Sequence, residues 1–201
     1  EYCNYPEEAL EKQSIGGFST PDIEQIIALA PDVVFADDIH LAEIIPALEG
    51  YGITVIGIDP ATLDEVLEAI DIVGRVTGVT GVSDALIADM RGRIQAITDV
   101  TSSISAEELT RVAYVVWHEP LMVSGGGTIH DELISACGGI NIAADMDSYA
   151  TISLESMMGA DPQVLIAGVG MGEGQDLVLQ YLQDEPRLEG TTARKNNAVY
   201  P

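Results

Sequence analysis

The sequence predicts an α/β protein in which two similar lobes are joined by one long helix. Strand-like apolar runs alternate along the chain with segments of helical periodicity, which is the pattern of an α/β fold. A sequence unit at residues 18–34 recurs at residues 149–165. Between these halves, residues 82–103 keep apolar side chains on one helical face, over a length that can cross a lobe or join two.

The first helix is predicted from its capping residues. Ser19 and Thr20 supply a hydroxyl cap, Pro21 suits the first turn, and Asp22 lies near the positive end of the helix dipole. Pro31 is expected to end this helix, since a residue before proline disfavours helical geometry.

The other elements follow from the same signals. Thr62 and Glu65 form a capping box, which opens a helix that runs to about residue 78. The remaining predicted strands are 33–36, 53–58, 112–117, 164–168 and 198–200, and the remaining predicted helices are 41–48, 82–103, 129–137, 154–158 and 177–182.

The repeated unit has a defined order: aromatic residue, hydroxyl residue, aliphatic residue, glutamate, short helix, proline and strand. Phe18 and Tyr149 are its aromatic residues, and Glu24 and Glu155 are its glutamates. In both copies the glutamate falls in the first turn of the predicted helix, where the dipole favours a carboxylate. A first-turn acid that only stabilises its own helix is the simpler interpretation of either glutamate alone.

Composition excludes some classes of partner. The 201 residues include 33 Asp and Glu against 8 Lys and Arg, which gives a net charge of −25. Nucleic-acid binding needs a basic face, and adsorption to an anionic membrane surface is disfavoured for the same reason. Cys3 and Cys137 are far apart in sequence and form no CxxC motif, so they predict neither a redox motif nor a disulfide framework.

Several stretches, taken in order, resemble one known family. They are YCNYP at residues 2–6, GGFS at 16–19, IEQIIALAPDVV at 23–34, YGITV at 51–55, PLMVSG at 120–125 and ACGGINI at 136–142. With these stretches the chain resembles the substrate-binding proteins of ABC importers for cobalamin, iron–siderophores and haem.

The resemblance implies a fold of the helical-backbone metal-receptor type. Two α/β lobes with mainly parallel sheets are then joined by one long backbone helix. On this basis residues 1–80 are expected to form an incomplete N-terminal lobe, residues 81–105 the interlobe helix, and residues 106–201 a C-terminal lobe that lacks its final helix. The chain is thus expected to be truncated at both ends.

The resemblance also implies a function without catalysis. A metal chelate is captured in the cleft between the lobes and delivered to the permease subunits of an ABC importer. Glu24 and Glu155 match the family's docking glutamates, one in each lobe, which pair with permease arginines. The expected location is extracytoplasmic, either periplasmic or as a membrane-anchored lipoprotein at the cell surface, with the signal segment absent from this sequence. No resident cofactor is expected.

Aromatic residues and a methionine are the candidates for ligand contact. Flat rings and a polarizable thioether suit a large planar macrocycle, although Phe18 and Met122 are also ordinary core residues. The scarcity of basic residues favours a corrinoid, with haem or a neutral siderophore next, over a strongly anionic ferric catecholate. His118 is a candidate axial ligand or a solvated loop histidine. The full candidate set is Tyr2, Tyr5, Phe18, Trp117, Met122 and Tyr149.

Two alternatives remain open. The first is a divalent-metal (Zn or Mn) binding protein that uses His40, His118 and His130, although these share no motif spacing. The second is a nucleotide-using α/β enzyme. Its phosphate would lie on one of two glycine-rich runs, SGGGT at residues 124–128 or GVGMGEG at 168–174, although the first lacks the P-loop lysine and the second lacks the acids of a dinucleotide fold.

Overall fold

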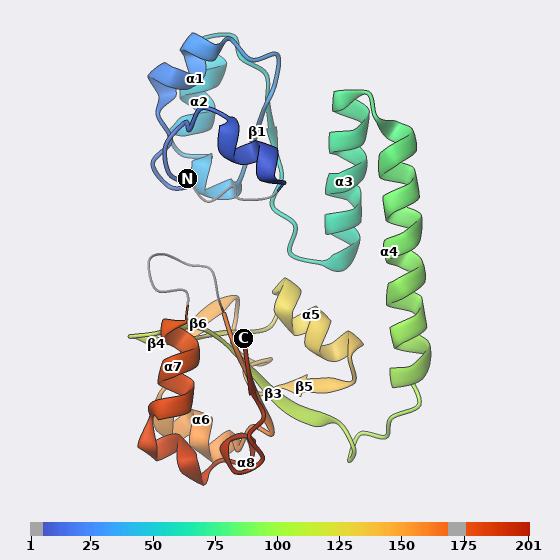
Figure 1. The fold of residues 1–201 in the computed structure, drawn as a ribbon, viewed down its shortest axis with the longest axis vertical. Helices are drawn as coiled ribbons and strands as arrows, with labels where there is room; N and C mark the ends of the chain where they lie inside the picture. Colours follow the sequence, from blue (N-terminus) through green and yellow to red (C-terminus); the bar gives the residue numbers. More distant parts are fainter. Residues whose placement is uncertain (1–5, 169–175) are drawn as a thin grey trace. The chain divides into compact units, whose positions relative to one another are not determined.

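A computed structural model describes residues 6–168 and 176–201 of the chain. The chain divides into two compact units, Glu1–Asp59 and Pro60–Pro201, which are described separately (Figure 1). Tyr2, Tyr5 and Cys3, together with most of the second glycine-rich run, lie outside the described residues.

The first unit is a small α/β assembly around two parallel strands. β1 (Val34–Ala36) pairs with β2 (Val55–Gly57) in the register Val34↔Val55. Its core is formed by Ile26, Ala36 and Leu48, which are all buried. The helical elements are η1 (Glu7–Glu11), α1 (Ile23–Leu29), η2 (Asp38–His40) and α2 (Ile44–Gly50).

α1 begins later than its hydroxyl residues predict. The cap is Asp22, whose carboxylate accepts a hydrogen bond from the Gln25 amide at 3.0 Å, so the predicted Ser19–Thr20 cap is wrong. Gly16 and Pro21 form a β-bridge, which holds the preceding residues in a closed loop, and the helix starts only after it. The predicted position of Glu24 in the first turn is confirmed.

The second unit opens with two packed helices, α3 (Leu63–Thr77) and α4 (Thr80–Thr101), shown side by side in Figure 1. The predicted capping box is confirmed, because the Thr62 hydroxyl accepts from the Glu65 amide and the Glu65 carboxylate accepts from the Thr62 amide. α4 is the long helix that the sequence predicts between its two halves. Among the described residues, no helix meets the length and hydropathy required to span a membrane.

The rest of the second unit is a mixed sheet with helices packed against it. Its strand order is β6-β4-β3-β7-β8, and β5 also pairs with β3. The β3–β5, β3–β7 and β7–β8 pairs are parallel, whereas β4 and β6 add antiparallel pairs. The strands are β3 (Thr110–His118), β4 (Leu121–Ser124), β5 (Gly139–Asn141), β6 (Tyr149–Thr151), β7 (Val164–Ala167) and β8 (Val199–Tyr200); the helical elements are α5 (Ile129–Ala136), α6 (Leu154–Ala160), α7 (Leu177–Asp184), η3 (Pro186–Gly190) and α8 (Thr192–Lys195).

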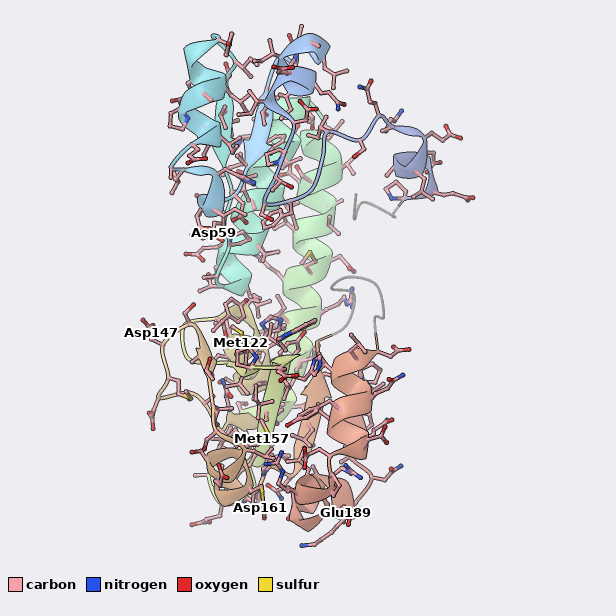
Figure 2. All side chains as sticks on the ribbon, turned by 90° about the vertical axis from the view of Figure 1, so that its left-hand side faces the viewer. Asp59, Met122, Asp147, Met157, Asp161 and Glu189 are labelled. Carbon is pink, nitrogen blue, oxygen red and sulfur yellow. The ribbon has the colours of Figure 1, made fainter. Side chains whose placement is uncertain are left out.

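The core of this unit lies between the sheet and its helices. Val115, Met157, Leu165 and Leu182 are each fully buried in one hydrophobic cluster. Figure 2 shows Met157 between the end of the unit that holds Met122 and the end that holds Asp161. Parallel strand pairs alternating with helices confirm the predicted α/β class.

α1 and α6 confirm that the repeated sequence unit folds in the same way twice. Each helix has 7 residues, with its glutamate in the first turn and a left-handed residue at its end. The left-handed residues are Ala30 (φ 46°) and Asp161 (φ 43°), and a proline follows each of them. In the second copy the cap is a hydroxyl residue, Ser153, whose side chain accepts from the Ser156 amide.

Candidate functional site

In the first unit, Phe18 is placed by a histidine. Its ring is 57% exposed and contacts the His40 ring edge-on, with 5.4 Å between centroids. The Asp37 amide donates to His40 Nδ1 at 3.1 Å, so the ring proton is on Nε2, which donates to the Phe18 carbonyl at 2.7 Å. His40 therefore links η2 to the loop that carries Phe18, and both of its ring nitrogens form hydrogen bonds.

A pocket of about 350 Å³ adjoins Phe18 within the first unit. Its volume is at the lower end of the range for small-molecule sites. It is mostly apolar, and its lining includes Phe18, Phe35, Ile44 and Leu48 together with the His40 ring. Phe18 is thus an exposed aromatic at the rim of an apolar hollow rather than a core residue.

In the second unit, Tyr149 lies in an equivalent position in the repeat. It is 47% exposed on β6, where it pairs with Ser124 of β4. The His130 ring lies edge-on to it, with centroids 6.1 Å apart, and the Tyr114 ring stacks on His130 at 3.9 Å. Each predicted aromatic residue of the repeat therefore has a histidine ring beside it in a T-shaped arrangement.

Strand pairing gathers three of the predicted ligand residues on one face of the sheet. Trp117 pairs with Met122, and Met122 pairs with Thr151. Directly paired residues share a face, and so do residues two apart along a strand, so Tyr149 is on the same face as Thr151. The strand register therefore places Trp117, Met122 and Tyr149 on one face, and Trp117 also packs against the hydrophobic core of this unit.

Trp117 and Met122 are both half-buried. The Trp117 indole N–H donates to the Glu119 carbonyl at 2.9 Å, and the strand register shifts between Val115 and Trp117. Such an irregularity interrupts the regular alternation of side chains between the two faces of the sheet. Figure 2 shows Met122 at the end of the second unit opposite Glu189.

His118 is the last residue of β3 and follows Trp117, so it lies on the opposite face of the sheet. It pairs with Leu121, which is a core residue, and its ring lies 5.7 Å from that of Tyr181. Its Nδ1 atom is buried and has no hydrogen-bond partner. The structure therefore does not place His118 as the solvated loop residue that the sequence allowed.

The two predicted docking glutamates are exposed on short helices. Glu24 lies in the first turn of α1 and Glu155 in the first turn of α6. Glu155 also affects a neighbouring arginine, Arg187. The pKa of Arg187 is raised, first by its hydrogen bond to Glu185 and to a smaller extent by the charge of Glu155. Neither docking glutamate forms an ion pair among the described residues.

Among the described residues, one group of acidic side chains lies close enough to share an ion. It is formed by Asp37, Asp38 and Asp59 of the first unit and contains none of the three histidines of the zinc alternative. The pKa of Asp38 is raised, first by its hydrogen bond with Asp37 and then by the charge of Asp59. No local sequence pattern reveals this cluster, because Asp59 follows β2 whereas Asp37 and Asp38 follow β1.

The first glycine-rich run does not form a phosphate cradle. The Gly125 and Gly126 amides donate to the Ser148 and Met146 carbonyls, both at 2.7 Å, so these donors are already used. A Cβ at Gly125 would lie 2.3 Å from the Met146 oxygen, which shows that the glycines permit close backbone packing.

Comparisons with known proteins identify the family. The family model described as "Periplasmic binding protein" matches residues 1–201. The vitamin B12-binding protein of Vibrio cholerae serotype O1 is 29% identical over 167 residues, covering 82% of this chain and 59% of that protein. The cobalamin-binding protein of Halobacterium salinarum is 34% identical over 155 residues, covering 75% of this chain and 41% of that protein.

A solved structure supports the same assignment. The apo periplasmic haem-binding protein RhuT from Roseiflexus sp. RS-1 superposes with a TM-score of 0.82 at 26% identity, covering 98% of this chain and 76% of that one. The chain covers about three fifths or less of the length of each of the two curated relatives described above. These relatives are named as binding proteins rather than enzymes, in agreement with the predicted absence of catalysis. The chain belongs to the periplasmic binding protein family.

Proposed function

We propose that this chain is the substrate-binding component of an ABC importer, located outside the cytoplasm, and that its cargo is a metal chelate. A corrinoid of the cobalamin type is the first candidate, with haem or a ferric siderophore next. The chelate is held in the cleft predicted from the sequence and is then delivered to permease subunits.

The observation that carries this proposal is the repeated aromatic residue. Phe18 and Tyr149 are both substantially exposed, and each has a histidine ring beside it in a T-shaped arrangement. Exposing a large apolar ring to water costs free energy, and holding it rigid costs conformational entropy, so a preorganised exposed ring suits ligand contact. Met122 and Trp117 add apolar area on the same sheet face as Tyr149.

The choice of a corrinoid rests on two further points. The two sequence relatives described above are named for vitamin B12 or cobalamin binding. The chain has only 8 basic residues, which gives little positive charge for an anionic catecholate.

Titration with known chelates tests the ligand. Trp117 is the single tryptophan, so its fluorescence reports binding near the predicted group. We expect quenching by cyanocobalamin that saturates, with weaker or no response to haemin and ferric siderophores. A response to haemin alone would replace the corrinoid with haem, and no response to any of them would refute capture of a metal chelate.

Substitution of Tyr149 tests the site. Tyr149→Ala is expected to weaken binding of the chelate about tenfold or more, since loss of a stacked ring costs about 1.4 kcal/mol. Tyr51→Ala is the matched control, because Tyr51 is 69% exposed at the end of α2 and belongs to no predicted ligand group. Equal effects of the two substitutions would contradict the assignment of Tyr149.

Permease docking by Glu24 and Glu155 is the second part of the proposal. Two carboxylates on short, capped helices can orient a complex as well as attract it, through charge-assisted hydrogen bonds to arginine. We expect Glu24→Gln and Glu155→Gln each to weaken association with the permease about tenfold, with unchanged chelate affinity. Glu49→Gln, an exposed acid on α2, is the control for net charge. Loss of chelate affinity in the docking variants would place these acids in the ligand site instead.

A further inference from the structure

His130 lies in a network of short hydrogen bonds at the start of α5. Its Nδ1 atom is 3.1 Å from the Ser124 hydroxyl, which is 2.8 Å from the Thr128 hydroxyl. The Thr128 hydroxyl in turn donates to the Gly125 carbonyl at 2.7 Å. Ser124 and Thr128 are both buried, with exposed fractions of 0% and 5%, so water does not compete for these bonds.

The protons of this network can be assigned one at a time. Each hydroxyl has one proton to donate. The proton of Thr128 goes to the Gly125 carbonyl, so the bond between the two hydroxyls is donated by Ser124. Ser124 then has no proton left for the imidazole, and His130 Nδ1 must be the donor to it. The neutral ring therefore carries its proton on Nδ1 and an unshared electron pair on Nε2.

The orientation of the ring is also fixed. Tyr114 stacks on its face at 3.9 Å, with planes inclined by 29°, and Tyr149 lies at its edge. Burial lowers the pKa of His130, so the neutral form prevails at neutral pH. In the described part of the chain Nε2 has no hydrogen-bond partner, yet it is not among the buried side-chain atoms that lack one, so it reaches solvent.

We propose that Nε2 of His130 is an axial ligand for the metal of the bound chelate. A histidine that donates from one ring nitrogen to a fixed acceptor and presents the other is the usual arrangement of a metal-binding imidazole. The Nε2 electron pair forms the bond to the metal, a water molecule leaves the same axial position, and no electron is transferred. This inference rests on the proposed function and adds to it that chelates with an exchangeable axial position bind more tightly than those without one.

The same network distinguishes His130 from the other described histidines. Both nitrogens of His40 are engaged with backbone atoms, and Nδ1 of His118 is buried. His130 also lies beside Tyr149, the residue that the proposed function places against the ligand.

Two corrinoids that differ in one axial group test this proposal. Aquocobalamin has an exchangeable water on cobalt, whereas the cyanide of cyanocobalamin occupies that position firmly. We expect the protein to bind aquocobalamin at least tenfold more tightly, with a change in its visible absorption spectrum as nitrogen replaces water. Ferric haemin gives a second probe, for which a shift of the Soret band is expected.

Variants separate ligation from positioning. His130→Gln should abolish the spectral change and bring the two corrinoid affinities within about twofold of each other. Ser124→Ala, which removes the acceptor that fixes the tautomer, should reduce the affinity ratio severalfold and make it more dependent on pH. His40→Gln is the control, and it should leave the ratio and the spectrum unchanged even if it weakens both complexes.

The outcomes distinguish this inference from the proposed function. Equal binding of both corrinoids without a spectral change would overturn axial ligation by His130 and leave chelate capture intact. An unchanged spectrum and affinity ratio in His130→Gln would also overturn it. Absence of binding to both corrinoids and to haemin would overturn the inference together with the proposed function.

Discussion

The contact between α3 and α4 predicts how much two glycine substitutions change the free energy of unfolding. Gly74 of α3 is buried against Ser83 of α4, and a Cβ built at Gly74 would lie 2.0 Å from the Ser83 oxygen and 2.4 Å from its Cβ. Gly92 of α4 is exposed, and a Cβ there would contact nothing within 4 Å. The two glycines thus provide the same substitution with and without a steric clash.

Opposite signs are expected for the two substitutions. Gly→Ala in an open helix interior stabilises by about 1 kcal/mol, so Gly92→Ala should raise the free energy of unfolding by that amount. At Gly74 the same gain is opposed by overpacking, which costs about 1–3 kcal/mol. Because the clash involves the Ser83 Cβ as well as its oxygen, we expect the upper part of this range and a net loss of about 1–2 kcal/mol.

Urea unfolding followed by circular dichroism measures both changes. Ser83→Gly should restore most of the stability lost in Gly74→Ala, because it removes both clashing atoms, and the double variant therefore tests the contact directly. Stabilisation by Gly74→Ala equal to that by Gly92→Ala would refute the close packing of α3 on α4.

Two further predictions concern other helix ends. Ala30→Gly should stabilise the chain by about 0.5–1 kcal/mol in urea unfolding, since Ala30 is left-handed (φ 46°) and glycine adopts this geometry without strain; a loss of stability would contradict that backbone assignment. The hydrogen bonds from Arg187 lower the pKa of Glu185 from 4.5 to about 2, so the stabilising effect of this ionised carboxylate is present above about pH 4.5 and is lost as the pH falls toward 2. Glu185→Gln should therefore flatten the fall of the thermal midpoint between those values, whereas Glu189→Gln on the same turn should not.

The sequence was sufficient for elements with strong local signals. The capping box at Thr62 and Glu65 places the start of α3 correctly, because those two side chains satisfy each other's backbone donors whatever packs around them. The long helix α4 and the parallel strands β3 and β7 likewise carry clear periodicity or β-branched runs. The two-fold repeat predicts matching helices, and α1 and α6 agree in length and in the position of their glutamates.

Tertiary contacts decide what the sequence did not show. Asp22 caps α1 in place of the preceding hydroxyls because the bridge from Gly16 to Pro21 closes the loop first. β6 is only three residues long and is defined by its pairing with β4, which no local pattern reveals. The tautomer of His130 depends on Ser124 and Thr128 together, so it needs their geometry as well as their identity.

The glycine-rich run at residues 124–128 connects these local features to the proposed ligand site. Its glycines allow the backbone of residues 146–148 to approach within hydrogen-bonding distance, and Cβ atoms there would collide with carbonyl oxygens. That approach sets Tyr149, the next residue, beside Ser124 in the β4–β6 pair and against the edge of His130. A motif that can suggest phosphate binding therefore acts through packing, since it brings the exposed ring and the oriented imidazole into one place.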